Sequence, residues 1–508
     1  MHRKLLLAAA AAVMVLAAPA GAQSKAVRNA AGTITKADVA RRVAIIADDS
    51  MMGRDTPSPG LEMTAAYIAS EFKRFGLRPG GDSGTWFQRF PLVLKRRLAE
   101  QSYVEFTQVE GEGTIVLPYS TSVRHWAGEL SGPVSGELVL LGGRIQVAEL
   151  PSDSVLKGRM LVWIADTSMQ QAGGEIYARA MQAGARGIIV ISNRDTADFA
   201  KLAAAAASQV MVTRAGAGAR DMPLALSVPE GAIVAQFPDA ARTFAQFRAA
   251  PQTISQVLTD WEVSVVVKDT VLGTTSSPNV VGIVEGTDPQ LKNEYIVFSA
   301  HMDHIGITPG RADSINNGAD DDASGTIGIV ELAEAFSRKG AAPKRSLIFL
   351  TVSGEEKGLW GSEHFVNQPP VPLTQIIANI NVDMIGRNWR DTVAVVGREH
   401  SDLGQALDRV AARHPELRMT PVNDPWPEER IFFRSDHFNF AKKGVPILFF
   451  TSGLHPDYHA VSDSPEKIDA EKEARLLQLV FYLGQEVGNS PARPVWVPAS
   501  YDAIVKGE

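Results

Sequence analysis

Apolar residues in the second half of the chain form short continuous runs that alternate with amphipathic segments. The runs predict strands at 279–286, 294–300, 346–353, 376–383, 392–397 and 445–451. Between them, apolar residues spaced three and four apart predict helices at 326–340, 401–414 and 470–487. Strands that are apolar on both faces, in alternation with helices, indicate a largely parallel sheet that is covered on both sides. We therefore expect an α/β protein with a mostly parallel mixed sheet flanked by helices.

The first half of the chain has a different pattern. Helical spacing runs through 36–78, and a turn-rich passage then leads into a strand. From about 125 to 255 short strands and many Gly and Ala residues predominate, and a strand, a helix and a strand are predicted in succession within 159–193. This order predicts a small α/β module. The alanine-rich stretch at 201–210 is compatible with a helix or with a loose insertion.

The chain of 508 residues is longer than a single hydrophobic core usually supports, which is about 250 to 300 residues. We expect the small module at 125–255 to interrupt a larger domain. The N-terminal part of that domain would be 23–124, and its C-terminal part would be 256–508.

The chain begins with MHRKLLLAAAAAVMVLAAPAGAQS, in which a short basic start precedes an apolar run and a group of small residues. This pattern is typical of a secretory signal peptide at 1–22 that is cleaved after Ala22. A membrane anchor is the alternative, but the apolar run is shorter than the roughly 20 residues that a span needs. We therefore expect an exported protein, periplasmic or secreted, without a membrane span after signal removal.

The composition restricts the cofactors and partners. The chain has no cysteine, so disulfides and thiolate metal sites are excluded, and any metal must be held by His, Asp and Glu. The net charge at pH 7 is −7, and no basic stripe stands out. Nucleic acid is therefore not an expected partner.

Polar clusters follow the predicted strands at the point where each apolar run stops. They contain, in chain order, His301 and Asp303, the pair Glu355 and Glu356, Asp383, and His459 with Tyr458 beside it. In a sheet of this kind functional groups collect at the carboxyl ends of the strands. We therefore expect these side chains to lie close together.

Each cluster also has a structural explanation when it is taken alone. His301 and Asp303 could form a structural pair, because residues two apart in an extended chain point the same way. Glu355 and Glu356 could be a solvated helix start, where negative charge is favourable. Asp383 ends a strand that should be buried, and a buried carboxylate without a partner is costly. Asp383 therefore needs a partner.

Taken together, two histidines and several carboxylates from separate segments favour a metal site. Zinc suits nitrogen and oxygen ligands in the absence of thiolates. A carboxylate shared between two ions would hold them about 3.5 to 4 Å apart, as in two-metal hydrolases. The stretch GADDDASGT offers Asp320, Asp321 and Asp322 directly before a helix. Spacing does not choose among the three, since Asp320 and Asp322 would face one way and Asp321 the other.

Six stretches of the chain resemble a known family, the co-catalytic zinc aminopeptidases that also include glutamate carboxypeptidase II, bacterial leucyl aminopeptidases and aminopeptidase Y. They occur in the family's order within 279–488 and read SAHMDHIG, NNGADDDASGT, PKRSLIFLTVSGEEKGLWGSEHF, NVDMIGR, RSDHFNFAKKGVPILFF and GLHPDYHAVSDSPEKID. The resemblance implies a zinc exopeptidase fold. The Gly- and Ala-rich region at 125–255 resembles the protease-associated domain that many members carry as an insertion.

The resemblance also assigns roles to residues and implies two zinc ions per chain. The metal ligands would be His301, Asp321, Glu356, Asp383 and His459, with Asp321 shared between the ions. Glu355 would be the general base, Asp303 the residue that supports His301, and Tyr458 a group that stabilises the oxyanion. Asp322 would help to cap the following helix, and Asp320 would be solvated or would support a ligand.

The resemblance implies an aminopeptidase that hydrolyses peptides from the N-terminus. A carboxypeptidase on the same scaffold is an alternative, and it would need a basic pocket for which Arg434 and Arg387 are candidates. Glutaminyl cyclases also share the scaffold but generally use one zinc ion. A receptor-like binding protein without catalysis is an alternative of a different class, and such relatives would be expected to lack ligand residues.

Overall fold

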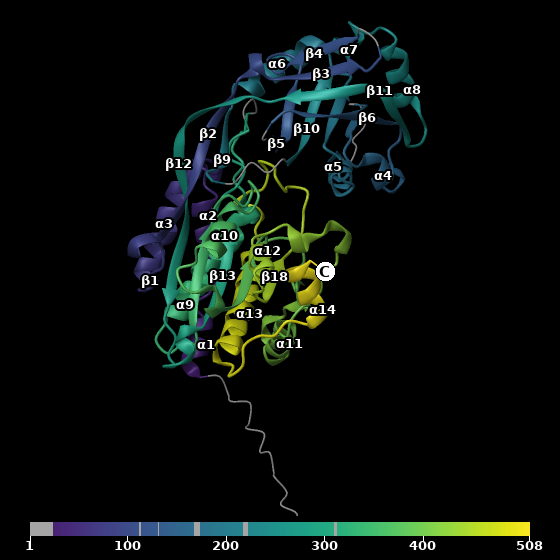
Figure 1. Ribbon diagram of the computed structural model, residues 1–508. Helices are drawn as coiled ribbons and strands as arrows, with labels where there is room; N and C mark the ends of the chain where they lie inside the picture. Colours follow the sequence, from purple (N-terminus) through teal and green to yellow (C-terminus); the bar gives the residue numbers. More distant parts are fainter. Residues whose placement is uncertain are drawn as a thin grey trace, which may run out of the picture. The chain divides into compact units, whose positions relative to one another are not determined.

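The structure is a computed structural model that describes residues 24–110, 113–130, 132–166, 173–216, 222–308 and 312–507 (Figure 1). The expected signal peptide at 1–22 lies outside the described residues. Among the described helices, none is both long enough and apolar enough to cross a bilayer. The chain divides into two compact units: one runs to Phe90 and resumes at Ser277, and the other is Pro91–Ser276.

A mixed sheet forms the centre of the first unit. In spatial order its strands are β17 (Thr420–Val422), β16 (Thr392–Val396), β18 (Ile447–Thr451), β15 (Ile376–Val382), β13 (Tyr295–His301), β14 (Ser346–Val352) and β12 (Asp269–Val284), with β1 (Arg78–Pro79) paired to β12. The four central strands β18, β15, β13 and β14 are parallel, whereas β12 and β16 pair antiparallel with their central neighbours. The predicted sheet, mixed and mostly parallel in its centre, is therefore confirmed.

Helices cover both faces of this sheet. The helices of the unit are α1 (Lys25–Ala31), α2 (Lys36–Ile46), α3 (Pro59–Phe75), α9 (Gly325–Ser337), α10 (Trp360–Asn367), α11 (Leu403–Arg413), α12 (His437–Lys442), α13 (Ala470–Asn489) and α14 (Pro498–Tyr501). Successive strand residues point to opposite faces, so Phe298 joins the core under α9 and α13, whereas Val297 joins the core under α10 and α12. This alternation explains why the central strands are apolar at every position.

The second unit has its own sheet of eight strands. Their spatial order is β4 (Thr114–Pro118), β3 (Tyr103–Gln108), β11 (Ile254–Val266), β6 (Val134–Gly142), β7 (Met160–Ile164), β8 (Gly187–Ser192), β10 (Met222–Pro229) and β5 (Arg124–Glu129). The helices are α4 (Asp153–Leu156), α5 (Gly173–Gln182), α6 (Thr196–Ala207), α7 (Glu230–Val234) and α8 (Ala240–Ala249). The predicted strand, helix and strand are β7, α5 and β8, and the alanine-rich stretch is helical, in α6.

The second unit extends beyond the expected module at 125–255. Strands β3, β4 and most of β11 lie outside that range, yet they pair within the same sheet. The chain crosses between the units within β12 and within β2 (Phe87–Arg97), and β2 pairs antiparallel with β9 (Val210–Arg214). Pairing between strands that are far apart in the sequence, such as β11 with β3, leaves no local sequence signal, so the expected boundaries are narrower than the unit.

Parallel strands bring their carboxyl ends to one edge of the sheet, and this determines where the candidate site lies. The segments that come after β13, β14, β15 and β18 all begin at that edge. The GADDDASGT stretch forms a short irregular turn, Ala319–Ser324, directly before α9. Helix α9 packs against β13, β14 and β15, so its first turn is held beside the same strand ends.

Candidate metal centre

The residues singled out from the sequence come from different elements and meet at this edge. His301 is the last residue of β13, Glu355 and Glu356 follow β14, Asp383 follows β15, and Tyr458 and His459 lie in the loop after β18. Asp321 approaches from the turn before α9. All of them except His459 line a small cavity of about 60 Å³.

One group of atoms surrounds His301. Its Nε2 lies 3.3 Å from Oδ1 of Asp321 and 3.6 Å from Oδ1 of Asp383. The other oxygen of Asp383 accepts a hydrogen bond from Oγ of Ser435 at 2.7 Å. Asp383 therefore has the partner that a buried carboxylate requires, and one of its oxygens is left to face His301 and Asp321.

A second group of atoms surrounds His459. Its Nε2 lies 3.2 Å from Oδ2 of Asp321 and 3.2 Å from Oε2 of Glu356. Asp321 thus turns one oxygen to each group. Although burial alone would raise the pKa of Asp321, the imidazoles of His301 and His459 hold it well below its usual value, so the carboxylate is charged.

These two groups fit a pair of metal ions. Asp321 Oδ2 is buried and accepts no hydrogen bond from the described residues, as expected of an oxygen whose partner is a cation. Nitrogen and carboxylate oxygen are the donors that zinc takes when no thiolate is present. Each group supplies one imidazole and two carboxylates, which is the number of protein ligands in many catalytic zinc sites.

The ring of His301 is fixed differently from the expectation. Its Nδ1 lies 3.1 Å from the backbone carbonyl oxygen of Asp303, whereas the carboxylate of Asp303 is 3.8 Å away. The carboxylate instead accepts hydrogen bonds from Thr56 Oγ1 at 3.1 Å and from the backbone N–H of Glu355 at 3.3 Å. Asp303 therefore supports His301 through its backbone, and its side chain orients the Glu355 segment.

Glu355 and Tyr458 are half-buried beside the candidate ligand groups. A carboxylate oxygen of Glu355 lies within 4.8 Å of the facing atoms of His301 and Asp383. Burial and the neighbouring carboxylates raise the pKa of Glu355 well above its usual value. Burial, with the same acidic surroundings, also raises the pKa of Tyr458, so its hydroxyl keeps its proton. The ring of Tyr458 stacks on His459 at a centroid distance of 3.9 Å.

A comparison with family models identifies the part of the chain that carries this geometry. The model of peptidase family M28 matches residues 279–484, which include all five candidate ligands and Glu355. Residues 279–484 belong to peptidase family M28. Aminopeptidase YwaD of Bacillus subtilis is 27% identical over 211 residues, which cover 39% of this chain and 42% of YwaD. A probable leucine aminopeptidase of Arthroderma benhamiae is 27% identical over 221 residues, which cover 41% of this chain and 57% of that protein.

The chain thus spans about half the length of these curated relatives. Among solved structures, an aminopeptidase from Aneurinibacillus sp. strain AM-1 aligns with 93% of this chain and 98% of its own, with 18% identity and a TM-score of 0.53. This likeness shows that the fold is shared along nearly the whole chain.

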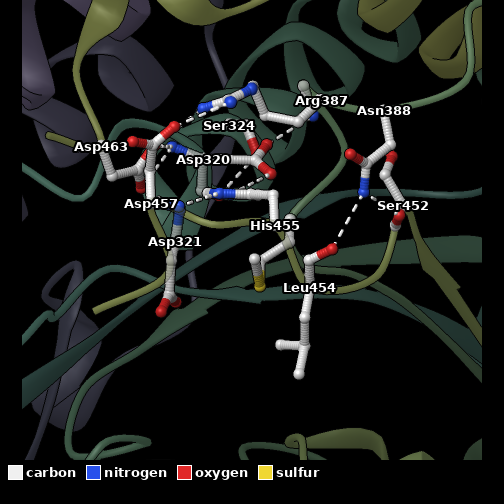
Figure 2. A network of polar contacts seen from close by, with 12 residues as sticks. Asp320, Asp321, Ser324, Arg387, Asn388, Ser452, Leu454, His455, Asp457 and Asp463 are labelled. Carbon is white, nitrogen blue, oxygen red and sulfur yellow. Dashed lines mark hydrogen bonds and ion pairs between the residues drawn. The ribbon is translucent and has the colours of Figure 1, made fainter. Parts of the chain in front are cut away.

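Within the M28 segment, the three adjacent aspartates have three different surroundings. Figure 2 shows the carboxylate of Asp321 turned away from that of Asp320. Asp320 is fully buried, and its Oδ2 lies 3.2 Å from Nε2 of His455. Asp320 is therefore not solvated, which excludes one of its two expected roles. Asp322 accepts a hydrogen bond from the backbone N–H of Gly325 at 2.9 Å, so it does cap the start of α9.

A network of ion pairs ties the aspartate turn to the loop that carries His459 (Figure 2). The carboxylate of Asp463 accepts hydrogen bonds from the backbone N–H groups of Asp320, at 3.0 Å, and Asp321, at 3.1 Å. Arg387 binds Asp457 at 2.9 Å and approaches Asp463 at 3.8 Å. Arg387 is thus engaged in this network, whereas Arg434 lines the cavity.

Sequence reasoning missed His304 in the M28 segment. This residue is fully buried, and its Nδ1 lies 2.9 Å from Oε1 of Glu356 and 3.7 Å from Oδ2 of Asp321. The sequence feature that could have indicated His304 is its position in HMDH, one residue after Asp303 and just beyond a predicted strand. Residues beyond a strand end have no fixed periodicity, so the direction of the His304 side chain could not be inferred.

Proposed function

We propose that this protein is an exopeptidase that removes N-terminal residues from peptides with the help of two zinc ions. The observation that carries the proposal is the carboxylate of Asp321, whose two oxygens face two separate groups of metal ligands. Family M28 membership of residues 279–484 supports a peptidase, and several of the curated relatives that match, among them YwaD, are named aminopeptidases.

Two ligand groups would hold the ions. His301 and Asp383 with Oδ1 of Asp321 would bind one ion, and His459 and Glu356 with Oδ2 of Asp321 would bind the other. When bound, such ions supply Lewis acidity to the scissile carbonyl and to the attacking water.

Glu355 is the residue that we propose as the general base. Its carboxylate lines the cavity beside His301 and Asp383. Because burial raises its pKa well above the usual value of a glutamate, the carboxylate is basic enough to take a proton from the attacking water. The protonated carboxyl group can then return that proton to the leaving amine.

Tyr458 would donate a hydrogen bond to the oxyanion that forms from the scissile carbonyl. Its hydroxyl is protonated at physiological pH because burial raises its pKa. A neutral donor next to a developing negative charge stabilises the transition state more than the substrate. The other wall of the cavity, with Met384, Ile431, Phe449 and Leu454, suits an apolar side chain on the residue that is released.

The choice between the two ends of a peptide rests on charge. Carboxylates dominate the polar lining of the cavity, which favours the ammonium group of a free N-terminus. Arg434 is the cation that could instead receive a C-terminal carboxylate, and its Nη1 lies 3.4 Å from Oε2 of Glu429. An aminopeptidase is therefore the first proposal, and the position of Arg434 makes a carboxypeptidase the second.

We also propose that the protein is exported and that the signal peptide is cleaved after Ala22. The proposal rests on the basic start, the apolar run and the small residues before the cleavage position. N-terminal sequencing of the protein recovered from the periplasm or the medium should begin at Gln23, and a mature chain that begins at Met1 would refute it.

A panel of matched peptides tests the proposed activity. One sequence with an apolar first residue is offered with both ends free, with an acetylated N-terminus, and with an amidated C-terminus, and the products are identified by mass spectrometry. Release of the first residue from the free and the amidated peptides, but not from the acetylated one, is expected. Cleavage of the acetylated peptide with loss of its last residue would favour the carboxypeptidase.

A further inference from the structure

His304 is a buried imidazole for which the proposed mechanism has no role. Its Nδ1 contacts Oε1 of Glu356 at 2.9 Å, while Oε2 of the same carboxylate lies 3.2 Å from Nε2 of His459. The rings of His304 and His459 stand nearly perpendicular, with centroids 5.6 Å apart. Two histidines therefore contact the two oxygens of Glu356, and only one of them was expected to bind the metal.

The second nitrogen of each ring indicates which histidine can be a ligand. A histidine that binds a metal usually donates its other ring N–H to a carbonyl or a carboxylate. His301 fits this rule, since its Nδ1 lies 3.1 Å from the carbonyl oxygen of Asp303 and its Nε2 faces the ligand carboxylates. The Nε2 of His304 is buried and has no hydrogen-bond partner among the described residues.

The tautomer of His304 can be inferred from this difference. If Nδ1 bound a metal, Nε2 would carry a buried proton without an acceptor, which is unfavourable. If Nδ1 instead donates its proton to Glu356, Nε2 carries only a lone pair. The hydrogen-bonded arrangement leaves no buried donor unsatisfied, so the geometry favours His304 as a donor to Glu356.

The slot that holds the His304 ring is built by Arg54 and Gly318. The backbone N–H of His304 donates to the carbonyl oxygen of Arg54 at 3.2 Å. The fully buried guanidinium of Arg54 donates in turn to the carbonyl oxygens of Met302, at 2.9 Å, and Gly318, at 2.9 Å. A Cβ atom at Gly318 would come within 2.6 Å of two ring carbons of His304. Arg54 therefore anchors the backbone at His304, and the missing side chain of Gly318 leaves the space that the ring occupies.

We propose that His304 is a positioning residue for Glu356. Its Nδ1–H donates to Oε1, which turns Oε2 toward His459 and toward the proposed second zinc ion. This inference rests on the two-zinc proposal and adds to it a difference between the two ions. The effect of His304 should fall on the ion at His459 and Glu356, because His304 contacts Glu356 and approaches the Asp321 oxygen that faces His459, Oδ2, at 3.7 Å. The Asp321 oxygen that faces His301 is Oδ1.

Titration of the metal-free full-length protein with Co²⁺ tests this role, with visible absorption to follow the ions and circular dichroism to verify folding. His304→Ala should leave the affinity of one ion unchanged and weaken the other by about 10- to 100-fold. His304→Asn carries an amide N–H at a place similar to that of Nδ1, so it should restore most of the lost affinity. His414→Ala removes another buried imidazole, stacked on Tyr482, and should leave both ions unaffected.

Two results would overturn the inference. Unchanged affinity for both ions in His304→Ala would show that the hydrogen bond does not position Glu356. Complete loss of the second ion in both His304→Ala and His304→Asn, together with its retention in His459→Ala, would make His304 the ligand. A wild-type protein that binds a single ion would refute the two-zinc proposal itself, and this result is seen before any variant is examined.

Discussion

His301 Nε2 lies 3.3 Å from Oδ1 of Asp321, and this contact joins the end of β13 to the turn before α9. The second oxygen of Asp321 faces His459 in the loop after β18. One carboxylate thus connects two groups of candidate metal ligands that come from segments far apart in the sequence. Removing the carboxylate of Asp321 should therefore have different consequences from removing that of Asp320 or Asp322.

Asp321→Ala should lose both metal ions together. Among the described residues, the carboxylate that this variant removes is the one that faces both His301 and His459. Asp320→Asn, its matched control, keeps a side chain of the same size beside His455. Bound zinc per chain, measured by plasma emission spectrometry after dialysis, should be near zero in Asp321→Ala and near two in Asp320→Asn. Retention of two ions by Asp321→Ala would rule out the shared carboxylate.

Glu355→Gln should keep both zinc ions and lose most of the activity. The substitution keeps the shape of the side chain but removes its ability to accept a proton, and general bases contribute about 10²- to 10⁴-fold. Turnover of a peptide with a free N-terminus and bound zinc should therefore be measured in the same samples. The two measurements distinguish loss of the general base from loss of the metal. Turnover within a few-fold of the wild type would exclude Glu355 as the base.

Asp463→Asn should destabilise the fold by about 2 kcal/mol, because two backbone N–H groups would lose a charged acceptor. The buried carboxylate of Asp463 holds the N–H groups of Asp320 and Asp321 at 3.0 and 3.1 Å. Urea unfolding in the presence of a chelator measures the effect without a contribution from metal binding. Glu285→Gln is the control, since its pair with Lys292 is exposed and such pairs contribute little. Equal free energies of unfolding of the two variants would show that the hydrogen bonds to Asp463 do not stabilise the fold.

Arg42→Met should destabilise the first unit by about 3 to 5 kcal/mol, the usual effect of leaving a buried partner charge unpaired. The guanidinium of Arg42 is buried and pairs with Glu331 and Glu334 of α9. Arg41→Met is a matched control on the same helix, because Arg41 is half exposed and its ion pair with Asp38 is partly open to solvent. The difference between the two variants in urea midpoint measures the contribution of the buried network, and similar midpoints would show that the network is not needed.

The sequence predicted the central strands and the residues at their ends because both obey simple rules. Strands such as β13 and β15 are continuous apolar runs, and a parallel sheet brings the residues after these strands to one edge. The same rule places His301, Asp383 and Glu356 close together. The choice of Asp321 within GADDDASGT came from the family resemblance, and the structure shows that the carboxylates of Asp320 and Asp321 point in different directions.

Other features were beyond prediction because they depend on contacts between segments that lack periodicity. The burial of Asp320 results from its approach to His455, and the support of His301 comes from the backbone of Asp303 rather than from its carboxylate. The direction of His304 is set by Arg54 and Gly318, neither of which has an unusual pattern around it. Such contacts become visible only in three dimensions.

In the proposed mechanism, two zinc ions at Asp321 would support hydrolysis of peptides from the N-terminus. The most direct test is a titration of the metal-free protein with zinc, in which bound metal and release of the first residue from a free peptide are measured in the same samples. Activity should rise from near zero and reach its full value as occupancy approaches two ions per chain. Full activity in samples from which a chelator has removed all the zinc would rule out a zinc-dependent peptidase.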